Sequence, residues 1–507
     1  MKPMASARSP SGRAESRCDC ASRVSSFLSP GELPRLPSAV RIPEYDRAAV
    51  STGIVHFGPG AFHRVHQANY IDDLLRTDPR WGICAVSLHS PGVRDALAPQ
   101  DGLYTTAVLD VECDYRIIGA LRELLVAPEN PAAVLERLVA PQTRMVSATV
   151  TEKGYCLSVG GLLDFEHAEV RHDLKTPEAP TTLIGYLAEA LRLRRDAGHT
   201  PFVVVSCDNL VDNGARLHRA VAQYARHFDR ALADWIEAEV PFPRTMVDSI
   251  TPATNDALRE RVTRALGIGD RWPVQRENFV QWVIERDERA DLSALQSAGV
   301  TLTDDVALYD RAKLRLLNGA HSTLAYVGSL AGLETVSQAM DNAELATFAR
   351  RLMTEDILPS VVAPQGLDLR HYIDTILARF CNPEIRHPLA QICWDGSQKL
   401  PFRLFGTIAD SMAAGRPIDR LCVPVAAWMH FVRTRAQSSQ RVVDPLTEQL
   451  FDIGLACRNS AASDVPRFLA MSTVFPEELR SARRFVIALN RAYDRLGMAS
   501  NVLGVLR

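Results

Sequence analysis

The sequence has little that would mark it for a membrane, a nucleic acid or a structural zinc ion. No apolar run approaches the roughly 20 residues that a membrane-spanning helix needs. The formal net charge is −3 and no basic stripe is concentrated anywhere, so a nucleic acid is not an expected partner. The ten cysteines form no CxxC pair, so no metal site is predicted. Their apolar surroundings favour reduced thiols and a cytoplasmic protein.

Residues 1–26 lack the apolar core of a secretory signal and are rich in Ser, Arg and Ala. We expect them to be a disordered tail or a spurious extension upstream of the true start; targeting to an organelle is the lower-ranked alternative. The 507-residue chain, with 47% hydrophobic and 23% charged residues, is long enough for two or three globular domains.

Short apolar runs alternate with helix-length stretches from residue 53 to about residue 210. The runs lie at 54–57, 83–88, 145–150 and 202–206, and residues 215–240 resemble one long helix. Such alternation predicts a parallel sheet with helices on both faces. Beyond Asp305, amphipathic helical patterns replace the strand signals. We therefore predict an α/β protein: a Rossmann-like N-terminal domain over 27–302, followed by a mostly α-helical C-terminal domain over 303–507.

A glycine turn follows the first apolar run. Gly58 and Gly60 come directly after Phe57 and before a helix-compatible stretch that continues to Leu75. Strand, glycine turn and helix is the arrangement that places a dinucleotide pyrophosphate at a helix N-terminus. The predicted cofactor-binding residues are Phe57, Gly58, Gly60, Ala61, Phe62, His63 and Arg64.

The choice between NAD and NADP is less sharply indicated. His63 stands where the third glycine of the usual fingerprint would be. The run 83–88 does not end on the acid that usually binds the ribose 2′-hydroxyl, and Asp95 is the nearest candidate. NAD is the preferred cofactor, with NADP left open.

The stretch Lys-Leu-Arg-Leu-Leu-Asn-Gly-Ala-His at 313–321 predicts a helix with polar groups on its buried face. At roughly 100° per residue, Asp310, His321 and Asn318 lie about 60°, 80° and 140° from Lys313, in a sector that also holds leucines. Buried polar groups are costly unless they are hydrogen-bonded to one another or to a ligand. The simpler alternative is a surface helix with a Lys–Asp pair.

Six motifs in this order resemble the polyol-specific long-chain dehydrogenases, the mannitol dehydrogenase and fructuronate reductase family. They are the turn at 58–64, Thr-Glu-Lys-Gly-Tyr at 151–155, Ser-Cys-Asp-Asn-Leu-Val-Asp-Asn-Gly at 206–214, Phe-Pro-Arg-Thr-Met-Val-Asp at 242–248, Lys-x4-Asn-x2-His at 313–321 and Asp-Gly-Ser-Gln-Lys at 395–399. The resemblance covers nearly the whole chain. It implies a zinc-independent, NAD-dependent secondary-alcohol dehydrogenase that acts on a small sugar alcohol, ketose or uronate. A monomer and a homodimer both remain open.

The resemblance also implies roles for single residues. A lysine whose pKa is lowered by burial can act as general acid and base, and Lys313 is the candidate. Asn209 and Asn318 would stabilise the alkoxide, and His321 would bind substrate hydroxyls or hold Lys313. The simpler alternatives are an Asx turn for Asn209 and a core histidine for His321.

Further residues are expected at the substrate and along the path of the proton. Asp310, one turn before Lys313, and Glu152, near the mouth of the cleft, form the predicted proton relay. A simple helix ion pair is the alternative for Asp310. The predicted substrate-binding residues are Asp248, Arg386, His387 and Lys399.

The substrate is predicted from the charges near residue 390. A uronate carries a carboxylate, so its pocket needs an extra cation, preferably a bidentate arginine. Arg386-His387 with Gln398-Lys399 resembles the fructuronate reductase branch, whereas the mannitol branch has arginine at the position of Gln391. We predict interconversion of D-mannonate and D-fructuronate. The alternative substrates are the D-mannitol/D-fructose pair and D-arabinitol, and the alternative function is that of a non-catalytic dinucleotide sensor. For Arg386, the alternative is a solvent-facing side chain.

Overall fold

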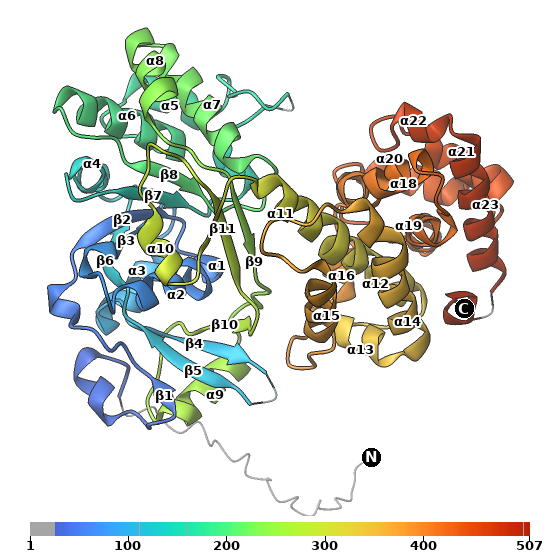
Figure 1. Cartoon of the computed structure of the whole chain (residues 1–507), viewed down its shortest axis with the longest axis horizontal. Coiled ribbons are helices and arrows are strands. Elements are labelled where there is room, and N and C mark those ends of the chain that lie inside the picture. Colours follow the sequence, from blue (N-terminus) through green and yellow to red (C-terminus); the bar gives the residue numbers. More distant parts are fainter. Residues whose placement is uncertain (1–25, 111, 159, 500, 507) are drawn as a thin grey trace, which may run out of the picture.

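The computed structural model describes residues 26–110, 112–158, 160–499 and 501–506 of the chain. Figure 1 shows two halves: one built on sheets, which ends with β12 (Thr301–Thr303), and one built from helices. Helix α11 (Val306–Ala312) leads from the first half into the second. The predicted tail lies, except for residue 26, outside the described residues.

A five-stranded parallel sheet forms the centre of the first half, with the strand order β6-β3-β2-β7-β8. Its strands are β2 (Thr52–Phe57), β3 (Gly82–Ser87), β6 (Leu121–Val126), β7 (Met145–Ala148) and β8 (Val203–Ser206). Every residue of β2 is buried, as expected for a parallel strand covered on both faces. The strand order reverses between β2 and β7, and α/β sheets bind ligands at such a point.

Helices cover both faces of this sheet. Val55 and Phe57 of β2 face one hydrophobic core, and Ile54 faces the other, because successive strand residues point to opposite sides. The helices of this region are α1 (Ala61–Val65), α2 (Gln67–Leu74), α3 (Gly92–Leu97), α4 (Pro131–Val139), α5 (Ala168–Lys175), α6 (Leu183–Asp196), α7 (Asn213–Arg226) and α8 (Arg230–Glu239).

The prediction of a single helix over 215–240 was wrong. Helix α7 ends at Arg226, and α8 begins at Arg230 after a short break. The carboxylate of Asp229 accepts a hydrogen bond from the backbone N–H of Leu232, which starts a new helix at this point. The helix-compatible stretch after Gly60 is likewise divided into α1 and α2, at His66.

Two smaller sheets complete the first half, and neither was predicted. One has the order β1-β5-β4-β10 and the other the order β12-β11-β9, each with parallel and antiparallel pairs. Their further strands are β1 (Val40–Arg41), β4 (Tyr104–Leu109), β5 (Asp114–Ile118), β9 (Thr245–Asp248), β10 (Val274–Glu277) and β11 (Gln281–Glu285), and α9 (Asp256–Leu266) and α10 (Ser293–Ser297) accompany them. Several of these strands are short or carry charged residues, so they lack an apolar signal.

The helical half packs around α12 (Gly319–Leu330) and α19 (Asp419–Gln437), which contact each other and share the largest hydrophobic core. The other helices are α13 (Val336–Asp341), α14 (Ala343–Arg351), α15 (Leu369–Phe380), α16 (Leu389–Ile392), α17 (Gly396–Leu400), α18 (Gly406–Ala413), α20 (Thr447–Ala456), α21 (Ala461–Leu469), α22 (Glu477–Arg480) and α23 (Arg483–Met498). The 3-10 turns within the described residues are η1 (Pro30–Arg35), η2 (Arg47–Ala49), η3 (Pro79–Trp81), η4 (Ala98–Gln100), η5 (Glu152–Tyr155), η8 (Leu358–Ser360) and η10 (Leu503–Leu506). No helix within the described ranges is long and apolar enough to span a membrane.

Three segments of the helical half are π-helical. They are η6 (Lys313–Asn318), η7 (Leu352–Ile357) and η9 (Pro401–Phe405). Segment η6 lies between α11 and α12 and packs against both η7 and η9. Wide π turns are rare and occur frequently at functional sites. Here they cluster around the segment that begins with Lys313.

Candidate functional site

A cavity of about 1500 Å³ lies between the two halves. Its sheet-side wall comes from the glycine turn after β2 and from the segments that follow β7, β8 and β9. Its helical wall comes from η6, α12, the loop before α16, α17 and η9. The cavity therefore opens at the carboxyl ends of the parallel strands. It is larger than the roughly 300–1000 Å³ of common small-molecule pockets, so it has room for a cofactor and a substrate together.

Most of the predicted site residues line this cavity. They are Lys313, Asn209, Asn318, His321, Asp248, Arg386, His387, Lys399, Glu152, Gly58, Gly60, Ala61 and Phe62. Phe57, His63, Arg64 and Asp310 do not line it.

The ammonium of Lys313, which belongs to the helical half, is held by two acceptors of the sheet half. Its Nζ donates hydrogen bonds to Oδ1 of Asn209 at 2.8 Å and to the carbonyl oxygen of Val247 at 2.6 Å. An ammonium has three N–H donors, so these two acceptors within the described residues leave one donor for a ligand. Because the ammonium can only donate, Asn209 accepts through its oxygen, and its amide N–H groups remain to donate elsewhere.

Burial lowers the pKa of Lys313, while the carboxylates of Asp248 and Asp310 act in the opposite direction. The side chain is only 6% exposed. A buried lysine with a lowered pKa can change its protonation state during a reaction, which is what a general acid and base must do.

The π turn η6 changes the spacing along the helix. In a regular α-helix, Asn318 would lie about 140° around the axis from Lys313. The i→i+5 hydrogen bonds of a π turn bring residues five apart closer to one face. Lys313 and Asn318 are the first and last residues of this turn, and both line the cavity.

His321 lies one turn beyond Asn318 and is 7% exposed. Its ring packs on Phe380, with centroids 4.5 Å apart, and meets the ring of His387 edge-on at 5.5 Å. Within the described residues, Nε2 of His321 and Nδ1 of His387 are buried without a hydrogen-bond partner. Burial holds the pKa of His321 well below its ordinary value, so the ring is neutral and one nitrogen can accept. Unpaired ring nitrogens at a cavity wall are suited to sugar hydroxyls.

A buried ion cluster that the sequence did not predict lies beside Lys313. Arg379 of α15 donates to both carboxylate oxygens of Asp248, at 2.8 and 3.0 Å, and to both of Glu277, at 2.8 and 2.7 Å. Burial alone would raise the pKa of Asp248, but Arg379 holds it below its usual range. The predicted substrate contact of Asp248 must therefore share a carboxylate that Arg379 already binds. The sequence signal for Arg379 is its position among the apolar residues of an amphipathic helix.

Besides Lys313, three cationic side chains lie on the helical wall. Arg386 is exposed on the loop before α16, at the rim of the cavity. Lys399 lies 3.8 Å from the carboxylate of Asp395. Arg403 of η9, which was not predicted, donates from Nη1 to Oγ of Ser322 at 3.0 Å. Burial lowers the pKa of Arg403 to about 10, so its guanidinium still carries a charge at neutral pH.

The glycine turn is built for a close approach of backbone and ligand. Gly58 has φ +85, and a Cβ there would lie 2.2 Å from the carbonyl oxygen of Thr149. At Gly60, an added Cβ would meet nothing nearer than the carbonyl oxygen of Gly58, at 3.9 Å. Gly58 is therefore needed by the fold itself, whereas the space in front of Gly60 belongs to the cavity. This space fits the predicted dinucleotide.

Three predicted cofactor-binding residues lie behind the turn. The ring of Phe57 is in the hydrophobic core, and the ring of His63 stacks on His56 with centroids 3.4 Å apart. Arg64 is buried and donates to the carbonyl oxygen of Trp272 at 2.8 Å. Their side chains support the turn from the protein side because none of them reaches the cavity. A contact with the cofactor stays a prediction for their backbone alone.

The two predicted relay residues differ in their surroundings. Burial raises the pKa of Asp310 to about 6, although the charge of Lys313 acts against it. Glu152 is exposed at the start of η5 and lines the cavity. Asp310 can therefore influence Lys313 through its charge, whereas Glu152 contacts solvent.

One group of side chains among the described residues has ligand atoms close enough together to hold a metal ion. Cys156, His167 and Glu169 place their ligand atoms within 4.8 Å of one another. None of the three lines the cavity, and Glu169 is exposed. This group therefore contributes nothing to the site around Lys313.

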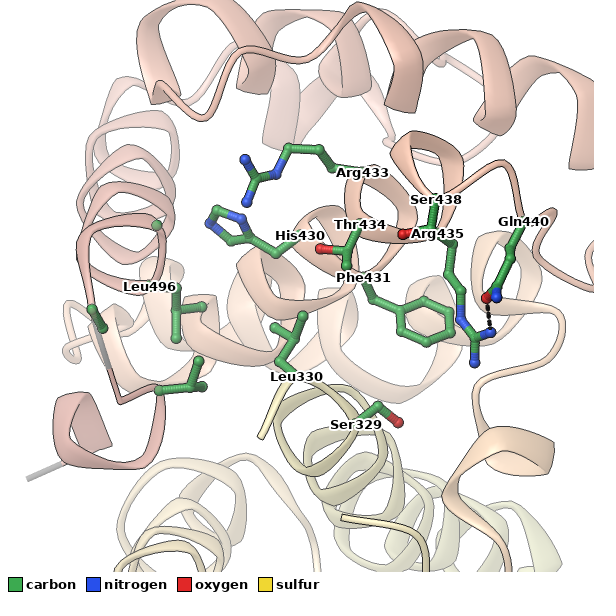
Figure 2. Close-up of a pocket in the computed structure, with 13 residues that line it drawn as sticks. Ser329, Leu330, His430, Phe431, Arg433, Thr434, Arg435, Ser438, Gln440 and Leu496 are labelled. Atoms are coloured by element: carbon green, nitrogen blue, oxygen red, sulfur yellow. Dashed lines mark hydrogen bonds between the residues drawn. The ribbon is translucent and has the colours of Figure 1, made fainter. Parts of the chain in front are cut away.

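A smaller cavity of about 400 Å³ lies in the helical half, between the ends of α12, α19 and α23. Figure 2 shows its two arginines pointing apart: Arg433 is directed toward His430, and Arg435 toward Gln440. The charged groups do not converge on one ligand. The cavity between the halves is thus the better candidate site.

Comparisons with known proteins agree with this geometry. Residues 52–296 match the family model described as the mannitol dehydrogenase Rossmann domain, and residues 305–497 match the mannitol dehydrogenase C-terminal domain. The chain is 39% identical to the D-mannonate oxidoreductase of Escherichia coli K12 over 464 residues, which cover 90% of this chain and 95% of that protein. It is 36% identical to the mannitol 2-dehydrogenase of Phaeosphaeria nodorum over 470 residues, covering 90% and 81%.

A solved structure is similar over nearly the whole chain. It is the Pseudomonas fluorescens mannitol 2-dehydrogenase in a ternary complex with NAD and D-mannitol. The sequence identity is 36% and the TM-score is 0.81, and the match covers 95% of this chain and 98% of that one.

Proposed function

The chain is an oxidoreductase of the mannitol dehydrogenase family, and we propose that it interconverts D-mannonate and D-fructuronate with NAD as cofactor. One observation carries this proposal. The buried ammonium of Lys313 is held by Asn209 and Val247 at a cavity that both halves enclose and that cations line. A relative named D-mannonate oxidoreductase supports the choice of substrate.

The chemistry assigns one task to each polar group around the reacting carbon. NADH, when bound, supplies the hydride to the ketone carbon. Lys313 donates its proton to the oxygen that becomes the hydroxyl, and in the reverse direction the neutral amine accepts that proton. The side-chain amides of Asn209 and Asn318 donate hydrogen bonds to the same oxygen while it carries negative charge. The neutral His321 binds a neighbouring hydroxyl.

The proposed cofactor is NAD rather than NADP. In a Rossmann fold, the ribose 2′ position lies near the end of the second strand, here β3, and an arginine accommodates the 2′-phosphate of NADP. Arg94, in the helix that follows β3, pairs with the carboxylates of Asp95 and Glu129. Its charge is already balanced, which supports NAD. The activity with NADPH tests this choice.

The second candidate function is that of a mannitol 2-dehydrogenase, because relatives of similar identity carry that name. The number of cations near the substrate favours the anionic substrate: Lys399 and Arg403 lie in the helical wall and Arg386 at its rim. A non-catalytic dinucleotide sensor is disfavoured because Lys313, Asn209 and His321 converge at one cavity.

We also propose that the protein acts in a reducing compartment, the cytoplasm. The cysteines of the described ranges are all free thiols, which supports this setting.

The test is NADH oxidation by the purified protein, with D-fructuronate and D-fructose compared at equal concentrations. The proposal predicts a higher kcat/KM for D-fructuronate, and NAD reduction by D-mannonate in the reverse direction. A higher kcat/KM for D-fructose would assign the protein to the D-mannitol reaction instead. Absence of turnover with D-fructuronate, D-fructose, D-mannonate and D-mannitol, in the presence of NADPH or NADP as well, would favour the sensor.

A further inference from the structure

We propose that the guanidinium of Arg403, with Lys399 beside it, forms an anion-binding subsite that takes the carboxylate of the substrate. This inference rests on the proposed function and deepens it. It also assigns the carboxylate to a residue other than Arg386, which the sequence had indicated.

The guanidinium of Arg403 has few partners within the described part of the protein. Other arginines with little exposure have charged or aromatic partners: Arg379 and Arg116 each bind two carboxylates, and the guanidinium of Arg64 lies over the rings of Tyr104 and Trp272. Arg194 donates instead to several backbone carbonyls. Arg403 has one hydrogen bond, to Ser322, and no carboxylate within ion-pair distance among the described residues. A guanidinium has five N–H donors, so most of those of Arg403 remain for a ligand.

Arg403 lies close to the residues that are proposed to hold the reacting end of the substrate. It lines the cavity from η9, which packs on η6, the segment of Lys313. Its own carbonyl would lie 3.2 Å from a Cβ at Gly319, the residue directly after Asn318. Its hydrogen-bond partner Ser322 directly follows His321. The guanidinium is therefore anchored beside the residues that are proposed to hold the reacting end of the substrate.

The charges around Arg403 and Lys399 also favour an anionic ligand. The positive charge of Arg403 helps to lower the pKa of Lys313, of His321 and of Lys399, so all three lie within its electrostatic reach. The nearest acid of this group is Asp395, 3.8 Å from Lys399. The carboxylates of Asp395 and Asp444 both act on Lys399, but among the described residues no carboxylate lies within ion-pair distance of the Arg403 guanidinium. A carboxylate on the ligand would complement it, and a planar guanidinium binds a carboxylate through two parallel hydrogen bonds.

Arg386 is less suited to this role. It is exposed on a loop, where solvent screens its charge and weakens an ion pair. Arg403, in contrast, is half-buried in the wall and fixed by Ser322. A neutral ketose would leave its donors without a partner, and sites that leave polar groups unpaired discriminate strongly against the wrong substrate.

The test compares kcat/KM for D-fructuronate and D-fructose in four variants. Arg403→Met is expected to lower the fructuronate-to-fructose ratio by about 100-fold or more, because it removes one partner of a close charge pair. Arg403→Lys, which keeps the charge without the planar fork, and Ser322→Ala, which removes its anchor, should lower it less. Arg386→Met tests the competing assignment. Melting temperature and NADH binding confirm that each variant is folded.

Two outcomes would overturn the inference: an unchanged ratio in Arg403→Met, or a collapse of the ratio in Arg386→Met instead. A wild-type protein that reduces only D-fructose would overturn the proposed function. Inhibition of D-fructose reduction by a sugar acid would then test whether Arg403 binds anions. D-Gluconate should compete with D-fructose in the wild-type protein, and Arg403→Met should weaken this inhibition. Absence of inhibition, or equal inhibition of both proteins, would contradict an anion-binding role for Arg403.

Discussion

The ammonium nitrogen of Lys313 lies 2.8 Å from Oδ1 of Asn209, and the two residues belong to different halves of the molecule. Asn209 follows β8 at the carboxyl edge of the parallel sheet, whereas Lys313 is the first residue of η6. The proposed acid and base is thus oriented only when the halves are packed together. The salt bridges from Arg379 to Asp248 and Glu277 span the same boundary and fix this packing.

Asp310→Asn is expected to move the pH dependence of alcohol oxidation to lower pH. The carboxylate of Asp310 raises the pKa of Lys313, so its removal lowers that pKa. Alcohol oxidation needs the neutral amine of Lys313, so its rate should rise at a lower pH in the variant. Ketone reduction needs the ammonium, so its rate should fall at a lower pH as the pH is increased. The pKa of Asp310 is about 6, so below this pH the wild-type carboxylate is itself protonated and the two profiles should converge.

The measurement for Asp310→Asn is kcat against pH in both directions. Asp304→Asn is the matched control, because Asp304 is exposed and pairs with Arg286 at the surface. Its profile should follow that of the wild-type protein. Superimposable profiles for Asp310→Asn and the wild-type protein would show that Asp310 does not influence the acid–base group.

Arg379→Met is expected to destabilise the protein by about 3–5 kcal/mol, because it leaves two buried carboxylates without a partner. Glu277→Gln should cost less, since Arg379 keeps its two hydrogen bonds to Asp248. The shift of the urea unfolding midpoint measures both effects. Equal midpoints for Arg379→Met and the wild-type protein would contradict a structural role of this cluster.

Gly58→Ala should lower the stability of the protein, whereas Gly60→Ala should lower its affinity for NADH. At Gly58, φ is positive and a Cβ would collide with the backbone of Thr149, so the variant should lose stability. At Gly60 the Cβ has space, so Gly60→Ala should keep the melting temperature and lose affinity for NADH. Titration of protein fluorescence with NADH, together with thermal melting, separates the two effects. Wild-type NADH affinity in Gly60→Ala would place the cofactor elsewhere.

Much of the fold could be predicted from the sequence because buried parallel strands are continuous apolar runs. Strands β2, β3, β7 and β8 were predicted at their observed places, and these predictions are confirmed. Strand β6 was missed because Arg122 and Glu123 interrupt its apolar run. The break between α7 and α8 was missed because no proline or glycine marks it.

The site was predictable only in part, for a physical reason. Lys313 and Asn209 occur in motifs, and the structure brings them together. Arg379 and Arg403 were not predicted, because their importance comes from contacts made only in the folded chain: Arg379 pairs with Asp248, 131 positions earlier. The π turn η6 likewise could not be read from an α-helical spacing of 100° per residue.

The central claim is that Lys313 is the general acid and base, and Lys313→Ala tests it most directly. The account predicts that this variant binds NADH with wild-type affinity and melts near the wild-type temperature, while kcat falls by about 10²–10⁴-fold. Added primary amines should restore part of the lost turnover by replacing the missing group. A Lys313→Ala variant that binds NADH and turns over at the wild-type rate would contradict the account.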